Sequence, residues 1–300
     1  MKKIWMTLLI AAYLPSFATA CDECGCAASG TMNGLMDFST GRFIGIRYAQ
    51  YGFSNFSLDG TAIRSHFYSA DLIASWKFGK SVQLIGLFPY KWMSYTADAV
   101  TTEDKGLSDI SLLSLITLYS NSGDVMAKRT STLLCKAGIK LPTGKFNDQF
   151  RVEHLPASLS LGSGSVDLSG GLQYRYKYEA WSAFADYQIE YNMRNDLEYR
   201  FGLQQAAAVK MVREFTDKKK QVHLRPYAGA LWEWNDWDTY HDLVLEGTKS
   251  MDVYLQPGME CAFGDWSIGA NLDIPLLSVY SDQPDIHAGA RITARAYYSF

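Results

Sequence analysis

Apolar and polar residues alternate over long segments of the chain. From Val166 to Tyr178, every second residue is Val, Leu, Tyr or Gly, and the residues between them are mostly Asp, Ser, Gln, Arg and Lys. After Glu179-Ala180 the alternation resumes and continues to Met193. Because successive side chains of a strand point to opposite faces of the sheet, this region is predicted to form a hairpin of two long strands with one apolar and one polar face.

The same pattern recurs along the rest of the chain. A second tight turn, at Gly264-Asp265, separates two alternating segments, and the chain ends within another at Phe300. About twelve strands are expected in all, an even number of the kind found in outer-membrane barrels made by one chain. The predicted strands are 42–54, 66–78, 82–92, 107–120, 132–142, 166–178, 181–193, 197–214, 222–235, 251–263, 266–274 and 286–300.

The predicted connections alternate in length. Short connections fall near 79–81, 179–180, 215–221 and 264–265, with one of moderate length at 121–130. Long connections fall near 55–65, 93–106, 143–165, 236–248 and 275–285, whereas the short link at 194–196 is an exception. Short periplasmic turns and long outer loops are typical of outer-membrane barrels. The predicted fold class is therefore all-β, a transmembrane antiparallel up-and-down β-barrel.

A soluble β-sandwich also alternates, but three observations favour the membrane. Most predicted strands are longer than the soluble mode of about 5–6 residues. Aromatic residues lie near both ends of the strands, for example Trp181 by a short turn and Trp232 by a long loop, as in the two interfacial belts of membrane barrels. The chain stops on Phe300, which resembles the terminal signal read by the barrel assembly machinery. The expected partners are therefore outer-membrane lipid and that machinery.

The first twenty residues predict export. Lys2 and Lys3 precede an apolar run from Ile4 to Leu14, and Ala18-Thr19-Ala20 supplies small residues for a signal peptidase. The apolar run is shorter than the roughly 20 residues that a membrane-spanning helix needs. The expected organisation is a signal peptide at 1–20, a Cys-rich segment at 21–40 and an outer-membrane barrel at 41–300. The expected location is the outer membrane of a Gram-negative cell.

If the apolar faces meet lipid, the polar faces enclose the lumen. Its charges have both signs, which predicts ion pairs rather than a strongly ion-selective tube. Counting from the turn at 179–180, Arg175 and Asp186 become diagonal neighbours on adjacent strands. Such pairs either rigidify a packed lumen or line a narrow path, and the sequence leaves both open. The lumen-lining candidates are Asp71, Asp167, Arg175, Asp186, Glu190, Arg291 and Arg295.

Three short blocks carry a family resemblance. They are Gly106–Leu112 (GLSDISL), Lys136–Lys145 (KAGIKLPTGK) and Leu161–Asp167 (LGSGSVD). In this order they resemble the phenol-degradation meta-pathway family of outer-membrane proteins. The resemblance implies a barrel that acts as a transporter, and it implies no particular binding residues. Physically, the glycines and Pro142 suit corners between strands and loops. A start with Cys21, Cys24 and Cys26, followed by Phe43–Tyr48 (FIGIRY) and Ser65–Phe67 (SHF), also resembles barrels of the Bacteroidetes type.

Three cysteines lie within six residues of the predicted mature start, at Cys21, Cys24 and Cys26. Three interpretations stay open. In an exported protein the first expectation is a disulfide. Thiolates are also soft ligands for Cu(I) or Zn, although four-coordinate zinc would need one more ligand. Cys21 also has the position of a lipid-anchored residue. Cys135 and Cys261 fall on apolar faces and are expected to act as small apolar residues.

Charge and motifs narrow the function. The chain has 28 Lys and Arg against 31 Asp and Glu, for a net charge of −3, and no long basic run, which argues against nucleic acid. No nucleophile elbow or phosphate-binding loop is present, so an enzyme and a resident cofactor are not expected. The leading hypothesis is a passive outer-membrane channel or uptake barrel for small solutes, apolar or aromatic ones included. The alternatives are a metal-binding envelope protein that uses the Cys cluster and a purely structural barrel.

Overall fold

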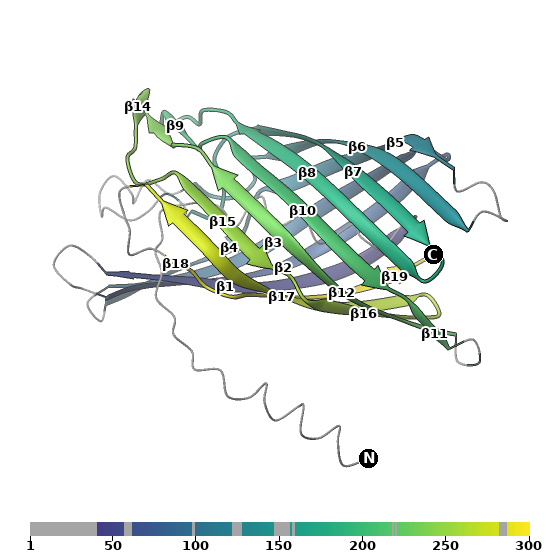
Figure 1. The fold of residues 1–300 in the computed structure, drawn as a ribbon. Helices are drawn as coiled ribbons and strands as arrows, with labels where there is room; N and C mark the ends of the chain where they lie inside the picture. The colour runs from purple at the N-terminus through teal and green to yellow at the C-terminus, as the bar shows by residue number, and fades with distance from the viewer. Residues whose placement is uncertain are drawn as a thin grey trace, which may run out of the picture.

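The computed structural model describes residues 41–56, 62–97, 100–121, 128–146, 157, 160–217, 219, 221–281 and 287–300. Within them, no helix is long and apolar enough to cross a membrane. The described chain is built from strands (Figure 1). They are β1 (Phe43–Phe56), β2 (Ala62–Phe78), β3 (Val82–Ala97), β4 (Val100–Leu107), β5 (Ile110–Ser120), β6 (Arg129–Leu141), β7 (Asp167–Tyr178), β8 (Trp181–Asn192), β9 (Tyr199–Arg200), β10 (Gln204–Arg213), β11 (Phe215–Asp217), β12 (Val222–Asn235), β13 (Thr239–Tyr240), β14 (Leu243–Val244), β15 (Ser250–Leu255), β16 (Gly258–Phe263), β17 (Trp266–Tyr280), β18 (His287–Ala288) and β19 (Arg291–Ser299).

These segments form twelve barrel strands, which close into an antiparallel barrel. In four places two short strands follow each other along one barrel strand: β4 with β5, β10 with β11, β15 with β16, and β18 with β19. Each barrel strand pairs with its neighbours in the chain, and β19 pairs with β1 from Phe43↔Ser299 to Gln50↔Ile292. Closure leaves no open sheet edge, which is what a membrane-spanning sheet requires. The predicted fold class is confirmed.

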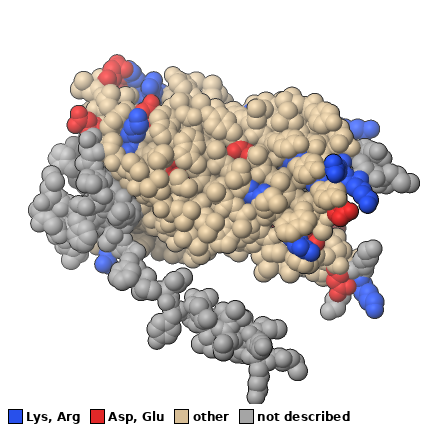
Figure 2. All heavy atoms as spheres, in the orientation of Figure 1, with Lys and Arg blue, Asp and Glu red and all other residues tan. Residues whose placement is uncertain are grey.

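The two faces of the wall differ as the alternation predicted. On β7, Leu168 and Leu172 are exposed on the outer surface, whereas Asp167 and Gln173 are buried inside. The outer face therefore presents apolar side chains to its surroundings and the inner face presents polar ones. In the view of Figure 2 the middle of the barrel wall carries few charged side chains, and Lys, Arg, Asp and Glu gather toward its two ends. This apolar band is the surface that lipid would cover.

The barrel has two unlike ends, which we call the turn end and the loop end. The turn end carries the tight turns at Gly79, Glu179 and Gly264, whose positive φ angles of 60°, 51° and 54° suit such turns. The loop end carries the β6–β7 connection and the small β9, β13, β14 sheet. At the turn end, arginines stack on outward-facing aromatic rings: Arg42 on Trp76 at 4.5 Å and Arg213 on Trp181 at 5.0 Å. Such rings match an interfacial belt.

Several predicted boundaries at the loop end are wrong. The predicted loop at 93–106 is largely strand, because β3 and β4 continue as a hairpin in which Ala97 pairs with Val100. Likewise β1 and β2 pair out to Phe56↔Ala62, and β17 continues to Tyr280. These extensions are rich in Thr, Ser and Tyr, which suit strands but obscure the apolar–polar alternation.

The segment 197–214 is also misassigned as one strand. It forms the short β9 and then β10, with 201–203 between them. The connection from β8 to β10 therefore spans 193–203, so the predicted exception at 194–196 is wrong and this connection is long like the others at the loop end. Similarly, segment 251–263 is interrupted at Pro257, whose missing N–H removes a ladder donor.

Apolar side chains also enter the lumen. One buried cluster joins β1, β2, β3 and β5 with β19, through residues such as Phe43, Ile73 and Leu113. A second cluster reaches across the lumen, because Phe53 and Phe67 on one wall and Leu231 and Tyr254 on the other belong to it. The lumen is therefore partly filled by side chains rather than an open tube.

Candidate functional site

The three sequence blocks that carry the family resemblance meet at the loop end. The carboxylate of Asp109, between β4 and β5, accepts hydrogen bonds from the backbone N–H of Gly144 (2.9 Å) and of Ser163 (2.6 Å) and from the Ser163 hydroxyl (2.9 Å). Thr143 Oγ donates to the Ser108 carbonyl at 3.0 Å. We call this group of Ser108, Asp109, Thr143, Gly144 and Ser163 the clasp. It holds both ends of the β6–β7 loop against the β4–β5 junction.

Two glycines allow the clasp to close. A Cβ atom on Gly162 would lie 2.7 Å from the carbonyl oxygen of Gly144, and one on Gly144 would lie 2.9 Å from the Cα atom of Gly162. Contacts this short between a side chain and backbone do not occur without movement. The glycines were predicted as corners between strands and loops; the structure adds that they permit the two ends of the loop to touch.

The clasp turns the loop toward the lumen. Ser108 donates its hydroxyl proton to the carbonyl of Leu161. The Leu161 side chain is 4% exposed and packs in the cluster that reaches Phe67, Leu231 and Tyr254. On the other flank, Asn195 donates from Nδ2 to the Ser163 carbonyl at 2.9 Å. The described part of the β6–β7 loop is therefore folded into the mouth of the barrel.

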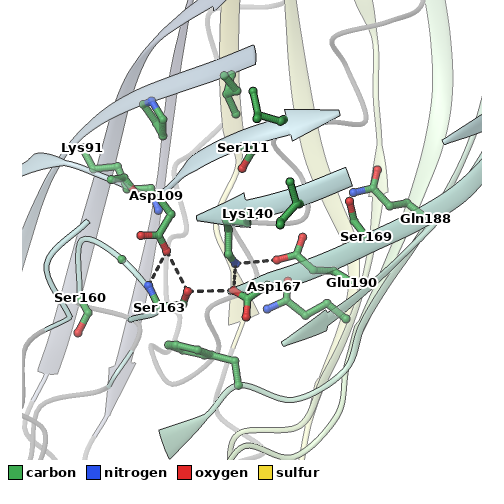
Figure 3. A pocket seen from close by; sticks show the side chains of 18 of the residues that line it. Lys91, Asp109, Ser111, Lys140, Ser160, Ser163, Asp167, Ser169, Gln188 and Glu190 are labelled. Atoms are coloured by element: carbon green, nitrogen blue, oxygen red, sulfur yellow. Dashed lines mark hydrogen bonds and ion pairs between the residues drawn. The ribbon is translucent and has the colours of Figure 1, made fainter. Parts of the chain in front are cut away.

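A cavity of about 80 Å³ lies directly beside the clasp (Figure 3). Strands β3, β5, β6, β7 and β8 and the β6–β7 loop contribute its walls. One part of the lining is apolar, with Leu87 and Pro89 at inward positions of β3, and another part is charged. The charged side chains are Lys91, Asp109, Lys140, Asp167 and Glu190.

The charged wall of β6, β7 and β8 is built on two lysines, and we call it the lysine arc. Lys140 Nζ lies 2.9 Å from Asp167 Oδ2 and 2.7 Å from Glu190 Oε1. Lys136 lies on the same face of β6, four residues before Lys140 and closer to the turn end. Its Nζ atom lies 2.6 Å from Asp186 Oδ1 and 3.0 Å from Gln188 Oε1. The alternation of β6 places both lysines inward, opposite the carboxylates of β7 and β8.

The opposite wall is built on arginines and is called the arginine arc. Both terminal nitrogens of Arg291 bind Glu233, at 3.3 and 3.0 Å, and Nη1 lies 3.9 Å from Asp273. Arg47 Nε binds Asp71 at 2.6 Å. Arg295 donates to the Tyr227 hydroxyl at 2.9 Å and to Asn271 at 3.0 Å.

All seven predicted lumen residues lie on inward-facing strand positions, but they fall into two groups. Asp167, Asp186 and Glu190 belong to the lysine arc, with Arg175 at its turn-end edge. Asp71, Arg291 and Arg295 belong to the arginine arc. The predicted diagonal of Arg175 and Asp186 holds in the register, and Gln173 lies between them: it accepts from Arg175 at 2.8 Å and donates to Asp186 at 2.9 Å.

Sequence reasoning missed three residues of the cavity. Asp109 and Ser163 were part of the blocks that carry the resemblance, but Asp109 was placed in the predicted strand 107–120 and Ser163 in a turn, and neither was given a role. Lys91 was not singled out, because the inward face of β3 also carries Ile85, Leu87 and Pro89, so its alternation is weak. The signal that could have found Lys91 is its place in the alternation of β3. It falls on the inward face, and it is the charged residue of a strand that is otherwise uncharged.

The predicted metal site at Cys21, Cys24 and Cys26 lies outside the described residues, as does the signal peptide, and both stay predictions. Among the described residues, no group of three or more His, Cys, Asp or Glu side chains is placed to hold a metal ion. Cys135 and Cys261 are unpaired and half-buried.

One cluster superficially resembles a catalytic relay. Thr216 Oγ and a Glu214 oxygen lie 3.1 and 2.9 Å from His223. Both contact the same ring nitrogen, Nδ1, so the imidazole cannot pass a proton between them as a triad histidine does. The expectation that the chain is not an enzyme stays a prediction.

Comparison with known proteins supports the fold. No family model and no curated protein matches the chain. Among solved structures, it is similar to an outer-membrane channel from Pseudomonas putida F1, with a TM-score of 0.66 and 15% identity over 88% of this chain and 97% of that chain. The β domain of the Bordetella autotransporter BrkA aligns with a TM-score of 0.49, 13% identity and coverage of 87% and 100%. The translocator domain of NalP from Neisseria meningitidis aligns with a TM-score of 0.45 and 12% identity, over 92% of this chain and 94% of that chain.

At these identities the likeness shows the fold alone. The chain has the architecture of outer-membrane barrels. The narrower resemblances, to the phenol-degradation family and to Bacteroidetes-type barrels, stay predictions.

Proposed function

We propose that this chain is an outer-membrane channel for the passive uptake of small solutes, with the β6–β7 loop narrowing its entrance. The observation that carries the proposal is the clasp: a loop folded into the mouth of a closed barrel, above a cavity whose charged wall continues into the lumen. A purely structural barrel has no need of a cavity under a loop that glycines and a buried carboxylate hold in place.

The lumen supports small solutes rather than large ones. Barrels of about eight strands are filled by side chains, and those of 16–18 strands leave a water-filled channel; this barrel lies between them. Apolar clusters and ion pairs both occupy its lumen. A solute would therefore pass in contact with both apolar and charged side chains, which favours small molecules that carry an apolar part.

Liposome swelling tests the proposal directly. The refolded chain is placed in liposomes, and swelling is followed with a series of solutes from glycerol to disaccharides and with short-chain organic solutes. We expect small solutes to enter and disaccharides to be excluded. Asp109→Ala removes the acceptor that binds both ends of the loop, so it should raise the swelling rate severalfold.

Asp265→Ala is the matched control, since Asp265 is an exposed carboxylate in the turn at the far end. It should leave the rate unchanged. If neither the wild type nor a variant with residues 147–159 replaced by a short Gly-Ser linker passes any solute, the chain is not a channel.

A further inference from the structure

The charged groups around the cavity differ in how well they are paired. Lys140 is bound by two carboxylates. Asp109 accepts three hydrogen bonds within the clasp. Asp167 accepts from Ser163 Oγ (2.9 Å), Ser165 Oγ (2.7 Å) and the Met193 N–H (3.0 Å), besides Lys140. These three groups are committed to holding the structure together.

Lys91 is different. Its side chain comes from β3, is partly buried and lines the cavity beside Asp109 (Figure 3). Within the part of the chain that the structure describes, its ammonium group makes no hydrogen bond or ion pair of the kind that Lys140 and Lys136 make. An ammonium group withdrawn from bulk water without a partner is costly. Among the described residues of the lining, Lys91 is therefore the cation that is available to a ligand.

The rest of the lining suits an organic anion. Leu87 and Pro89, at inward positions of β3, offer an apolar surface, and Ser111 and Ser169 place hydroxyl groups at the same cavity. The volume of about 80 Å³ holds roughly five waters at about 15 Å³ each, or one small organic molecule. Because Lys140 is already bound by two carboxylates, Lys91 can pair with one negative charge through a charge-assisted hydrogen bond. A second negative charge on the ligand would meet only the carboxylates of the lining.

We propose that the cavity is a binding site for small monocarboxylates with an apolar tail, in which the carboxylate binds Lys91 and the tail lies against Leu87 and Pro89. This inference rests on the channel function proposed above and names its solute class. The site lies immediately beneath the clasp, so a carboxylate entering past the loop would meet Lys91 before it reached the ion pairs of the lysine arc.

Binding to the detergent-solubilised full chain tests the site, with pentanoate, pentanamide and pentylamine as probes of equal length. Calorimetric titration at pH 7 should show that pentanoate binds most tightly, since only it can pair with an ammonium group. Lys91→Gln should weaken pentanoate binding by about tenfold, which corresponds to about 1.4 kcal/mol, close to the lower end of what one hydrogen bond to a charged group contributes. Lys91→Arg should retain most of the affinity.

Lys105→Gln is the matched control. Lys105 is an exposed lysine near the same end of the barrel, at an outward-facing position of β4 where it pairs with Trp92. It removes the same charge and should leave the affinity unchanged. Equal pentanoate affinity in wild type and Lys91→Gln, or tighter binding of pentylamine than of pentanoate by the wild type, would overturn the proposal. The probe series needs no variant, so it decides even if Lys91→Gln does not fold.

The outcomes also separate this site from the channel. If solutes enter liposomes but pentanoate binding does not depend on Lys91, the proposed binding site is wrong and the proposed channel function stands. If pentanoate binds through Lys91 but no solute crosses, the binding site stands and the channel function fails.

Discussion

The lysine arc and the arginine arc line the same lumen but are built differently. In the arginine arc, the guanidinium group of Arg291 binds Glu233 with two nitrogens and lies 4.9 Å above the ring of Tyr254. Arg295 similarly lies 5.8 Å from the Tyr227 ring. In the lysine arc, Lys140 makes point contacts with two carboxylates and faces a cavity rather than a ring.

The difference follows from the two cations. The guanidinium group is planar, presents its donors as a rigid fork and stacks on aromatic faces, so it builds a packed wall. The ammonium group is compact and strongly hydrated, and it holds its partners while leaving space for water. The comparison indicates that one side of the lumen serves mainly as structure and the other, next to the loop, serves the solute.

The largest effect on stability is expected from Arg291→Ala. Removing this side chain leaves Glu233, whose side chain is 0% exposed, without its ion pair, and breaking such a buried pair costs about 3–5 kcal/mol. Urea unfolding of the barrel in lipid vesicles measures the loss. Arg291→Lys keeps the charge but not the fork or the stacking, and should fall between wild type and Arg291→Ala. A loss below about 1 kcal/mol, the size of an exposed pair, would contradict the view of this arc as a packed wall.

Lys140→Ala should cost less, about 2–3 kcal/mol, the penalty for leaving a polar partner poorly satisfied. Asp167 keeps its hydrogen bonds from Ser163, Ser165 and Met193, and water in the cavity can reach Glu190. The same unfolding measurement applies. The comparison between the arcs fails if Lys140→Ala destabilises the barrel more than Arg291→Ala does.

The sequence was sufficient to predict the barrel because closure and lipid exposure impose one simple rule on every strand. Leu168 and Leu172 outside, with Asp167 and Gln173 inside, follow directly from period two. The rule failed at the loop end. There the extensions of β3 and β4 are mostly small or polar, so their alternation is too weak to mark a strand. In β17 a register shift between Leu277 and Pro275 interrupts the alternation.

The site was less predictable, because it depends on contacts between residues far apart in the chain. The blocks around Asp109, Gly144 and Ser163 were recognised as unusual, but nothing in their spacing shows that one carboxylate binds the other two blocks. The inward position of Lys91 follows from the alternation of β3. That it has no ion-pair partner among the described residues depends on which carboxylates Lys140 binds. Pairing of this kind appears only when the strands are placed side by side.

Gly162→Ala should act on the clasp more than on the barrel. Its new methyl group would collide with the Gly144 carbonyl, and the strain of about 1–2 kcal/mol is relieved when the loop moves away. We expect faster cleavage of the β6–β7 loop by added protease and faster liposome swelling. Gly170→Ala is the control, because the nearest atom to its Cβ is 3.9 Å away. Unchanged cleavage in Gly162→Ala would show that the loop does not depend on the clasp.

The smallest effect is expected where the two arcs meet, at the turn end. Glu214, in the link between β10 and β11, binds Lys177 of β7 at 3.3 Å and Arg225 of β12 at 3.2 Å. Burial by itself would raise the pKa of Glu214, but the positive charges of Arg225 and Lys177 outweigh it and lower the pKa below the ordinary 4.5. A carboxylate with a lowered pKa stabilises the folded state above its unfolded pKa, and that stabilisation is lost as the pH falls below about 4.5.

Glu214→Gln should therefore reduce stability at pH 7 by less than about 1 kcal/mol, and the difference from wild type should shrink as the pH falls further below 4.5. Unfolding midpoints measured from pH 7 to pH 3 test this. His223 also lies 2.9 Å from Glu214 and gains charge on acidification, so the range below pH 4.5 decides: a difference that grows from pH 4.5 to pH 3 would mean that Glu214 does not join the arcs as an ionised carboxylate.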